Sequence, residues 1–195
     1  MTSKFPAHPE RRPVVVTGAS SGIGQATAEA LAAAGHPVVI AARRLGELQG
    51  IATSIREDGG EAHAVHLDLA DPESILRFVD AAHTAVGEVE VIVANAARNQ
   101  VGSILETPPE ELEGSGVRVS IVRPGPTLTE MGWDWDMTRT QAALDEWTRW
   151  GLVRHDSYMR PSAVAQAVAA VVAMPRGAQI TSLEIHPEAP VREDD

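Results

Sequence analysis

The residues best suited to chemistry lie in one glycine-rich turn that directly follows an apolar run. The stretch VVVTGASSGIGQA, residues 14–26, places Gly18, Gly22 and Gly24 between a predicted strand and a predicted helix. Gly18 lets the chain turn sharply, Gly22 lets the backbone approach a bound group, and Gly24 lets the helix pack closely on the sheet. The helix N-terminus offers free N–H groups and a positive dipole end. The pattern predicts a diphosphate-binding loop.

Two arginines follow the next apolar run, residues 38–42. Ala42 stands about 20 residues past the loop, where dinucleotide-binding proteins carry an acid for the ribose 2′-hydroxyl. Arg43 and Arg44 come directly after it, and a guanidinium can hold a 2′-phosphate through paired, charge-assisted hydrogen bonds. These residues favour NADP(H) over NAD(H), with NAD(H) still possible. The alternative interpretation is that both arginines only cap a surface strand.

The elements that must position these residues alternate between strands and helices. Strands are predicted at 14–17, 38–42, 62–67 and 90–94, and helices at 22–34, 45–58 and 71–86. The second half predicts strands at 117–122 and 179–185, and helices at 138–150 and 161–174. The composition, 44% hydrophobic but only 4% aromatic, suits Ala/Leu helices and Val/Ile strands. The chain therefore predicts an α/β protein with a doubly wound parallel sheet.

The TGxxxGxG spacing resembles that of the short-chain dehydrogenase/reductase family, and other motifs agree over nearly the whole chain. Asp68-Leu69 resembles the family's adenine-flanking pair, and residues 95–97, Asn-Ala-Ala, resemble its Asn-Ala-Gly motif. Residues 123–125, Arg-Pro-Gly, followed by Thr129, resemble the motif on the nicotinamide side. The resemblance implies a Rossmann-type fold and hydride transfer between NADP(H) and an alcohol or carbonyl substrate. The residues predicted to hold the coenzyme are Gly18, Ser20, Ser21, Gly22, Ile23, Gly24, Arg43, Arg44, Asp68, Leu69, Asn95, Ala96, Ala97, Pro124, Gly125 and Thr129. The family's second basic residue, just before Gly22, is Ser21 here, which moderates the expected preference for NADP(H).

The family's catalytic residues have no counterpart in this sequence. The family uses a serine and a Tyr-x-x-x-Lys pair, in which the tyrosine passes a proton to or from the substrate oxygen. The single tyrosine, Tyr158, is followed four places later by Ser162, and the single lysine, Lys4, lies near the N-terminus. We therefore predict no catalytic residue within the 195 residues.

The signals for a helix start at residues 107–110 are not followed by a helix, and this indicates where the catalytic residues are missing. Thr107 and Glu110 form a capping box, which predicts a helix. Gly114 ends this predicted helix after about one turn, and a predicted strand rich in β-branched residues follows. The family layout places a lost contiguous block, one central strand and two helices of about 60 residues in all, between Glu113 and Gly114. Two interpretations stay open. The protein is an oxidoreductase of which this sequence is incomplete, or it is a catalytically inactive NAD(P)-binding sensor or partner subunit. We expect one Rossmann domain, 1–195, with a leader (1–12), a nucleotide-binding half (13–113) and a C-terminal part with the substrate lid (114–195).

The bulk properties exclude several other classes. The net charge of −11 without a basic run argues against nucleic acid and membrane-surface partners, and the lack of cysteine excludes disulfides and thiolate metal sites. No metal site is predicted, because His63 and His66 point to opposite faces of one strand. Without a membrane span or signal-peptide core we expect a cytoplasmic protein. The resemblance implies a dimer or tetramer, and residues 131–137, rich in Trp and Met, either line an apolar substrate pocket or pack a lid.

Overall fold

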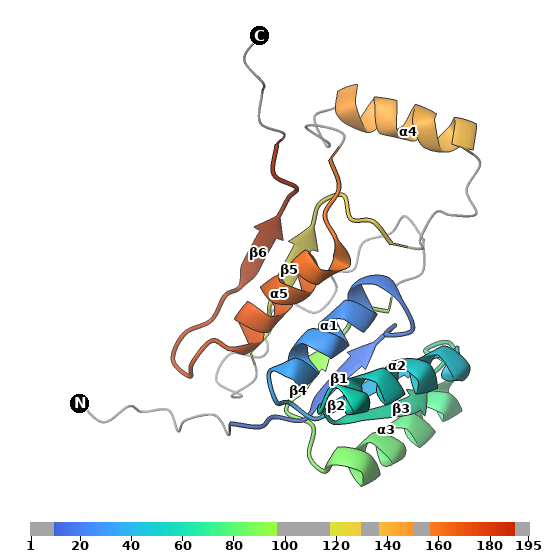
Figure 1. Ribbon diagram of the computed structural model, residues 1–195, viewed down its shortest axis with the longest axis vertical. Coiled ribbons are helices and arrows are strands. Elements are labelled where there is room, and N and C mark those ends of the chain that lie inside the picture. Colours follow the sequence, from blue (N-terminus) through green and yellow to red (C-terminus); the bar gives the residue numbers. More distant parts are fainter. Residues whose placement is uncertain (1–9, 97–117, 130–136, 150–156, 190–195) are drawn as a thin grey trace.

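The computed structural model describes residues 10–96, 118–129, 137–149 and 157–189, and these form an α/β protein (Figure 1). The first half contains β1 (Val14–Thr17), α1 (Gly22–Ala33), β2 (Val38–Ala42), α2 (Leu45–Glu57), β3 (Ala62–His66), α3 (Pro72–Val86) and β4 (Val91–Val93). The second half contains β5 (Ile121–Pro124), α4 (Met137–Arg149), α5 (Pro161–Val172) and β6 (Ser182–Ile185).

The first-half strands form one parallel sheet in the order β3-β2-β1-β4. Val14 of β1 pairs with Val38 of β2 on one side and with Val91 of β4 on the other. β1 and β2 are almost wholly apolar because helices bury both of their faces. The prediction of a Rossmann-type parallel sheet is confirmed.

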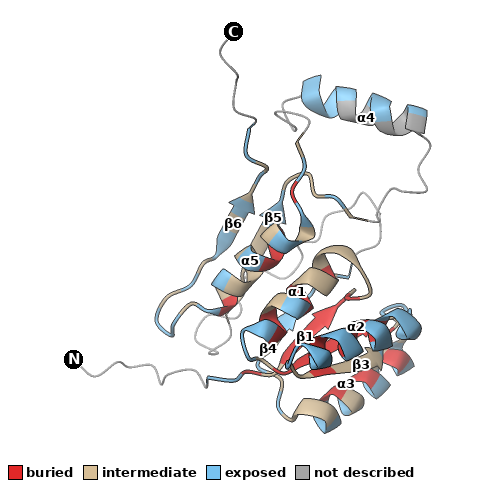
Figure 2. Ribbon diagram, in the orientation of Figure 1, coloured by how far each residue is buried: buried red, intermediate tan, exposed pale blue. Residues whose placement is uncertain are grey.

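Each face of this sheet has its own apolar core (Figure 2). On one face Val14, Val16 and Ile40 pack with Leu31 of α1 and Leu48 of α2. On the other face the alternate strand residues join α3, and this second core contains Val15, Val39, Ala41, Leu67, Phe78 and Ala82. Successive strand residues point to opposite faces of the sheet, so α1 and α2 pack on one face and α3 on the other.

The sheet divides between β4 and β5. Among the described residues β5 pairs only with β6, in a separate parallel two-stranded sheet, and α1 packs against α5 beside it (Figure 1). The division falls at the place where the sequence predicts a missing strand. The predicted junction itself, between Glu113 and Gly114, lies outside the described residues.

All strands but the first two are shorter than predicted, with β3 and β4 losing one or two residues and the two strands of the second half differing more. The strand predicted at 117–122 is observed as β5 at Ile121–Pro124, and the strand predicted at 179–185 is observed as β6 at Ser182–Ile185. The ladder starts with Ile121 opposite Ser182 and ends with Pro124 opposite Ile185. Since β5 has no described partner on its other side, the residues before Ile121 have no ladder to join.

Two arginines bind the C-terminal turn that follows α5. The buried Arg12 guanidinium donates to the Val172 carbonyl, and Arg118 Nη1 donates to the carbonyls of Met174 at 3.0 Å and Ala178 at 2.9 Å. Burial lowers the pKa of Arg12, and the nearby positive charge of Arg118 lowers it further. These bonds tie the chain before β1 and before β5 to one helix end, where carbonyls lack helical partners.

Candidate functional site

The turn between β1 and α1 has backbone geometry that glycine adopts readily and other residues do not. Gly18 and Gly22 have φ values of 65° and 60°, in the left-handed region. Gly24 has a different constraint: a Cβ there would lie 2.4 Å from the Gly18 carbonyl oxygen and 2.5 Å from Asn95 Nδ2. Gly24, which is buried, thus allows close packing inside the turn, and the positive-φ backbone before it fits the close approach of a diphosphate.

Asn95 and Thr17 join the tip of β4 to this turn. Asn95 Nδ2 donates to the carbonyls of Thr17 at 3.0 Å and Gly18 at 3.2 Å. Thr17 Oγ1 accepts from the backbone N–H groups of Asn95 and Ala96, both at 3.1 Å. The Asn95 amide, predicted to hold the coenzyme, therefore supports the loop internally. Sequence analysis missed Thr17, although a hydroxyl that closes an otherwise apolar strand was the available signal.

Arg43 and Arg44 follow β2, and both are exposed. Arg44 reaches back to the glycine-rich turn, where its Nη2 donates to Ser20 Oγ at 3.0 Å and to Ser21 Oγ at 3.1 Å. Its Nη1 lies 3.9 Å from Glu47 Oε1 in the first turn of α2. The end of β2 and the turn after β1 are thereby joined by one guanidinium.

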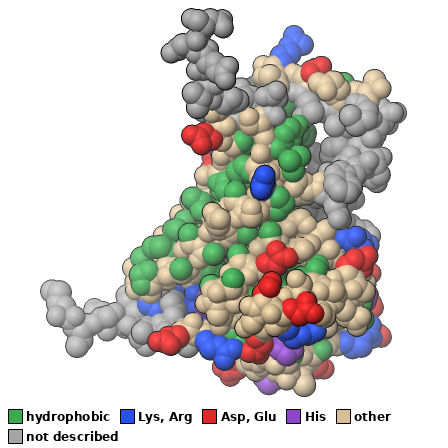
Figure 3. Space-filling model, viewed as in Figure 1, with side chains coloured by type: hydrophobic (Ala, Val, Ile, Leu, Met, Phe, Trp, Pro, Cys, Tyr) green, Lys and Arg blue, Asp and Glu red, His purple; other side chains and the backbone are tan. Residues whose placement is uncertain are grey.

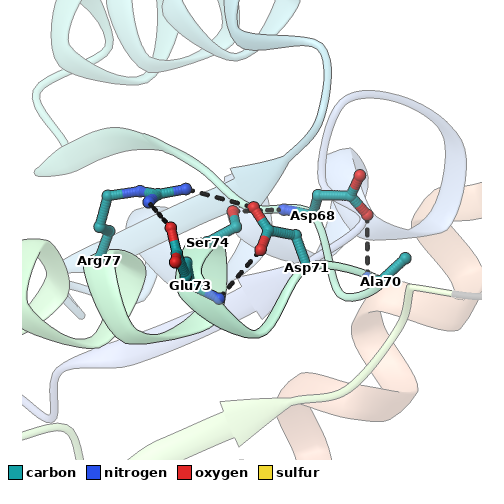
Figure 4. Close-up of polar contacts among 6 residues, drawn as sticks. All are labelled: Asp68, Ala70, Asp71, Glu73, Ser74 and Arg77. Atoms are coloured by element: carbon teal, nitrogen blue, oxygen red, sulfur yellow. Dashed lines mark hydrogen bonds and ion pairs between the residues drawn. The ribbon is translucent and has the colours of Figure 1, made fainter.

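The turn between β3 and α3 is held by its own carboxylates (Figure 4). Asp68 Oδ1 accepts from the Ala70 N–H at 3.0 Å, and the Asp68 N–H donates to the buried Ser74 hydroxyl at 3.0 Å. Asp71 caps α3 by accepting from the Glu73 N–H at 3.0 Å, as its position before Pro72 predicts. The Asp68 carboxylate thus shapes its own turn and leaves Leu69 exposed beside it.

The loop after β5 lies beside the glycine-rich turn. The Gly125 N–H donates to the Ile185 carbonyl at 2.8 Å, which fixes the Pro124-Gly125 corner on β6. Thr129 lies beside the turn, because its Cβ and Cγ2 would be 3.4 Å from a Cβ placed on Gly22. The Pro-Gly motif of the second sheet therefore lies near the first sheet, although among the described strands none pairs the two sheets.

The structure gathers most, not all, of the predicted residues. The glycine-rich turn, Arg44, the 95–96 segment and Thr129 meet at the carboxyl ends of the strands, the edge at which doubly wound sheets bind ligands. Asp68 and Leu69 follow β3, the outer strand of the sheet. Ala97 lies outside the described residues, as do Trp133 and Trp135 of the predicted lid.

Other features of the described residues point to no second site. His63 Nε2 contacts Glu61 Oε1 at 3.4 Å, and the part of the chain that the structure describes has no group of three or more His, Asp or Glu residues suited to a metal ion. Within those same ranges, no helix combines the length and the apolar character needed to cross a bilayer. Tyr158, the single tyrosine, is partly exposed between α4 and α5.

Comparison with known families and curated proteins identifies relatives of the first half. Residues 12–114 match the model of the family described as short chain dehydrogenase. The uncharacterised oxidoreductase YxbG of Bacillus subtilis is 36% identical over 103 residues, which are 53% of this chain and 38% of the relative. An uncharacterised oxidoreductase of Mycobacterium tuberculosis is 38% identical over 98 residues, 50% of this chain and 37% of the relative. The matched region thus spans little more than a third of the length of these relatives.

Solved structures resemble the fold over a longer range. A short chain dehydrogenase of Burkholderia cenocepacia, in complex with NADP, aligns with a TM-score of 0.71 and 24% identity, covering 90% of this chain and 96% of that one. An actinorhodin polyketide ketoreductase variant with NADPH aligns with a TM-score of 0.69 and 20% identity, covering 93% and 98%. At these identities the likeness establishes a shared fold.

Proposed function

The chain belongs to the short-chain dehydrogenase family, and from that premise we propose that it is the coenzyme-binding part of an NADP(H)-dependent oxidoreductase. The reaction of the whole protein is a hydride transfer between the nicotinamide ring and an alcohol or carbonyl carbon, with the hydride supplied or taken up by the bound coenzyme. The observation that carries this proposal is the meeting of three strand ends at one glycine-rich turn. That turn is hydrogen-bonded to Asn95 after β4 and to Arg44 after β2, and Thr129 after β5 lies beside it.

In this proposal the residues contact the parts of the dinucleotide in the order in which their strands lie in the sheet. Gly18, Gly22 and the first turn of α1 receive the diphosphate, because their backbone is accessible and the helix dipole favours an anion. Ser20, Ser21, Arg43 and Arg44 surround the adenosine ribose. The remaining predicted contacts are Ile23 and Gly24 at the start of α1, Asp68 and Leu69 near the adenine, Asn95, Ala96 and Ala97 near the second ribose, and Pro124, Gly125 and Thr129 near the nicotinamide.

The preference for NADP(H) rests on charge at the end of β2. Ala42 occupies the position where an acid would bind the ribose 2′-hydroxyl and repel a 2′-phosphate. Arg43 and Arg44 supply two positive charges directly after it. Family members of the same fold have been crystallised with NADP or NADPH. NAD(H) is expected to bind more weakly.

The catalytic serine, tyrosine and lysine belong, in this proposal, to a block missing between residues 113 and 114. The complete protein reduces or oxidises its substrate with that block in place, as a homo-oligomer. Hydrophobic side chains gather over α5 on the face shown in Figure 3. The resemblance implies an interface made by α5 and β6. Charged side chains gather instead over α2 and α3.

Coenzyme binding and intact mass test the proposal together. The purified chain is titrated with NADPH and NADH by calorimetry or coenzyme fluorescence, and tighter binding of NADPH is the expected result. Absence of binding of both coenzymes overturns the proposal, and tighter binding of NADH overturns the assigned preference. Mass spectrometry of the protein from its native source should give a mass above the 20.7 kDa of this sequence. A mass equal to 20.7 kDa removes the oxidoreductase activity from the proposal.

A further inference from the structure

Residues 157–160, just before α5, pair with the loop that follows β5 (Figure 1). Thr127 and Met159 form a parallel bridge. The Met159 N–H donates to the Pro126 carbonyl, and the Leu128 N–H donates to the Met159 carbonyl, both at 2.9 Å. These bonds hold the segment before α5 against the loop that carries the Pro-Gly motif.

The two paired segments have an inner and an outer face. Directly paired residues point to the same side of a ladder, and successive residues alternate between its sides. Met159 points inward and is 7% exposed. The outer face therefore carries Leu128, Tyr158 and Arg160. Leu128 and Tyr158 are 60% and 42% exposed, and Arg160 is exposed as well.

This outer face lies next to the nicotinamide side of the proposed coenzyme site. Thr129 follows Leu128 directly, and its Cβ would be 3.4 Å from a Cβ placed on Gly22. The helix that Arg160 precedes, α5, packs against α1, the helix that the glycine-rich turn starts. A ligand held by Tyr158 and Arg160 would therefore lie beside the end of the coenzyme that exchanges hydride.

Arg160 occupies a position that normally favours a different residue. It is the N-cap of α5, where a serine, threonine, asparagine or aspartate side chain accepts a hydrogen bond from the first helical turn. A guanidinium cannot accept one, and Arg160 makes no side-chain capping bond. Within the described ranges its guanidinium forms no ion pair either. A residue that opposes local stability without such compensation is expected at a functional site.

The three outer side chains match a ligand with an apolar body and one anionic group. The arginine fork binds carboxylate or phosphate oxygens in pairs. The tyrosine ring presents an apolar surface with a hydroxyl at its tip, and the leucine extends that surface. Because the whole chain has a net charge of −11, an anionic ligand needs a local positive group of this kind.

We propose that Arg160 and Tyr158, with Leu128, form the part of the substrate site that selects a carbonyl substrate bearing a carboxylate or a phosphate. This inference rests on the proposed function, to which it adds a substrate class. Arg160 binds the anionic group. Tyr158 and Leu128 pack on the apolar part of the substrate, between that group and the reacting carbon.

Binding of matched probes to single variants tests this assignment. Each protein is saturated with NADP+ and titrated with 4-acetylbenzoate, with its uncharged methyl ester and with 4-acetylphenyl phosphate, and ligand-observed NMR gives the three Kd values. Arg160→Ser and Tyr158→Ala are compared with the unmodified chain. Arg77→Ser, in α3, is the control, because it removes the same charge from an exposed position outside the site.

We expect the unmodified chain to bind at least one anionic probe more tightly than the ester. Arg160→Ser should raise the Kd of that probe about 10-fold, since a charge-assisted hydrogen bond is lost, and should change the Kd of the ester less than about twofold. Tyr158→Ala should weaken the anions and the ester alike, because all three pack on the ring. The anion that loses more in Arg160→Ser identifies the group, carboxylate or phosphate, that the site selects.

Thermal unfolding separates a role in substrate selection from a structural one. Serine is a favourable N-cap, so Arg160→Ser should raise the Tm by about 2–4 °C while it weakens anion binding. A lower Tm with an equal loss for all three probes would assign Arg160 to the fold and overturn the inference. NADP+ binding without any preference for the anions over the ester overturns it as well, and leaves the proposed function standing. If the unmodified chain does not bind NADP+, the proposed function fails, and this inference fails with it.

Discussion

Replacing Gly24 with alanine has two opposite effects on stability. Alanine has the higher helix propensity, but its Cβ disturbs the packing of the glycine-rich turn. In an exposed helix this substitution stabilises by about 1 kcal/mol, because alanine loses less backbone entropy. Here the new Cβ would lie 2.4 Å from the Gly18 carbonyl oxygen and 2.5 Å from Asn95 Nδ2. Overpacking of this kind costs about 1–3 kcal/mol, and loss of the Asn95–Gly18 hydrogen bond costs about 1 kcal/mol more. We expect a net loss of about 1–3 kcal/mol in the free energy of unfolding.

Gly50→Ala in α2 provides the matched control. A Cβ at Gly50 meets nothing within 4 Å, so the same substitution should stabilise by about 0.5–1 kcal/mol. Urea unfolding followed by circular dichroism measures both variants, and thermal scans should show shifts of opposite sign, about 2–4 °C per kcal/mol for a chain of this size. NADPH binding should weaken only in Gly24→Ala. Stabilisation of both variants to the same extent would refute the packing argument.

Three further outcomes follow from hydroxyls and one histidine. Thr17→Val should destabilise by about 2–3 kcal/mol, because the N–H groups of Asn95 and Ala96 lose their acceptor. Thr27→Val should stabilise by about 1 kcal/mol, since the Thr27 hydroxyl is buried without a hydrogen-bond partner among the described residues; urea unfolding measures both. Burial, and then the charge of Arg12, lowers the pKa of His36 below its ordinary 6.5, so the unfolded chain takes up the proton first. Stability should therefore fall as the pH drops below about 6.5, and less steeply in His36→Gln, as pH-dependent melting measures.

The first half of the fold was predictable because each element carries local signals. Asp71 before Pro72 starts α3, and Gly35 and Gly59, both with positive φ, follow α1 and α2. Apolar runs bounded by such signals locate β1 and β2 to the residue. β5 was misplaced because its extent depends on a distant partner, β6, and local sequence carries no information on where that ladder ends.

The sequence predicts which strand ends make up the candidate site, but it predicts the contacts between their side chains less well. Glycine spacing identifies the turn, because the reasons for glycine are local backbone geometry. The contacts that each side chain makes depend on the tertiary structure. Asn95 is directed to the carbonyls of Thr17 and Gly18, and Arg44, not its neighbour Arg43, is directed to the serines. No spacing rule distinguishes two adjacent arginines that follow the same strand.

The proposed missing block would account both for the division of the sheet among the described residues and for the lack of a Tyr-x-x-x-Lys pair in the sequence. Ile92 lies opposite Val15 in the β1–β4 ladder and faces the same side, yet Val15 is 3% exposed and Ile92 is 69% exposed. Parallel sheets are normally covered on both faces, so an exposed isoleucine on β4, the edge strand of the described sheet, supports the proposal that a neighbouring strand and its covering helix are missing. The relative YxbG has about 270 residues, because the 103 matched residues are 38% of its length. It is therefore longer than these 195 residues by about 75, which is more than the predicted block of about 60. A strand inserted between β4 and β5 would pair both edges, its helices would cover Ile92, and the same block would supply the tyrosine–lysine pair that this sequence lacks.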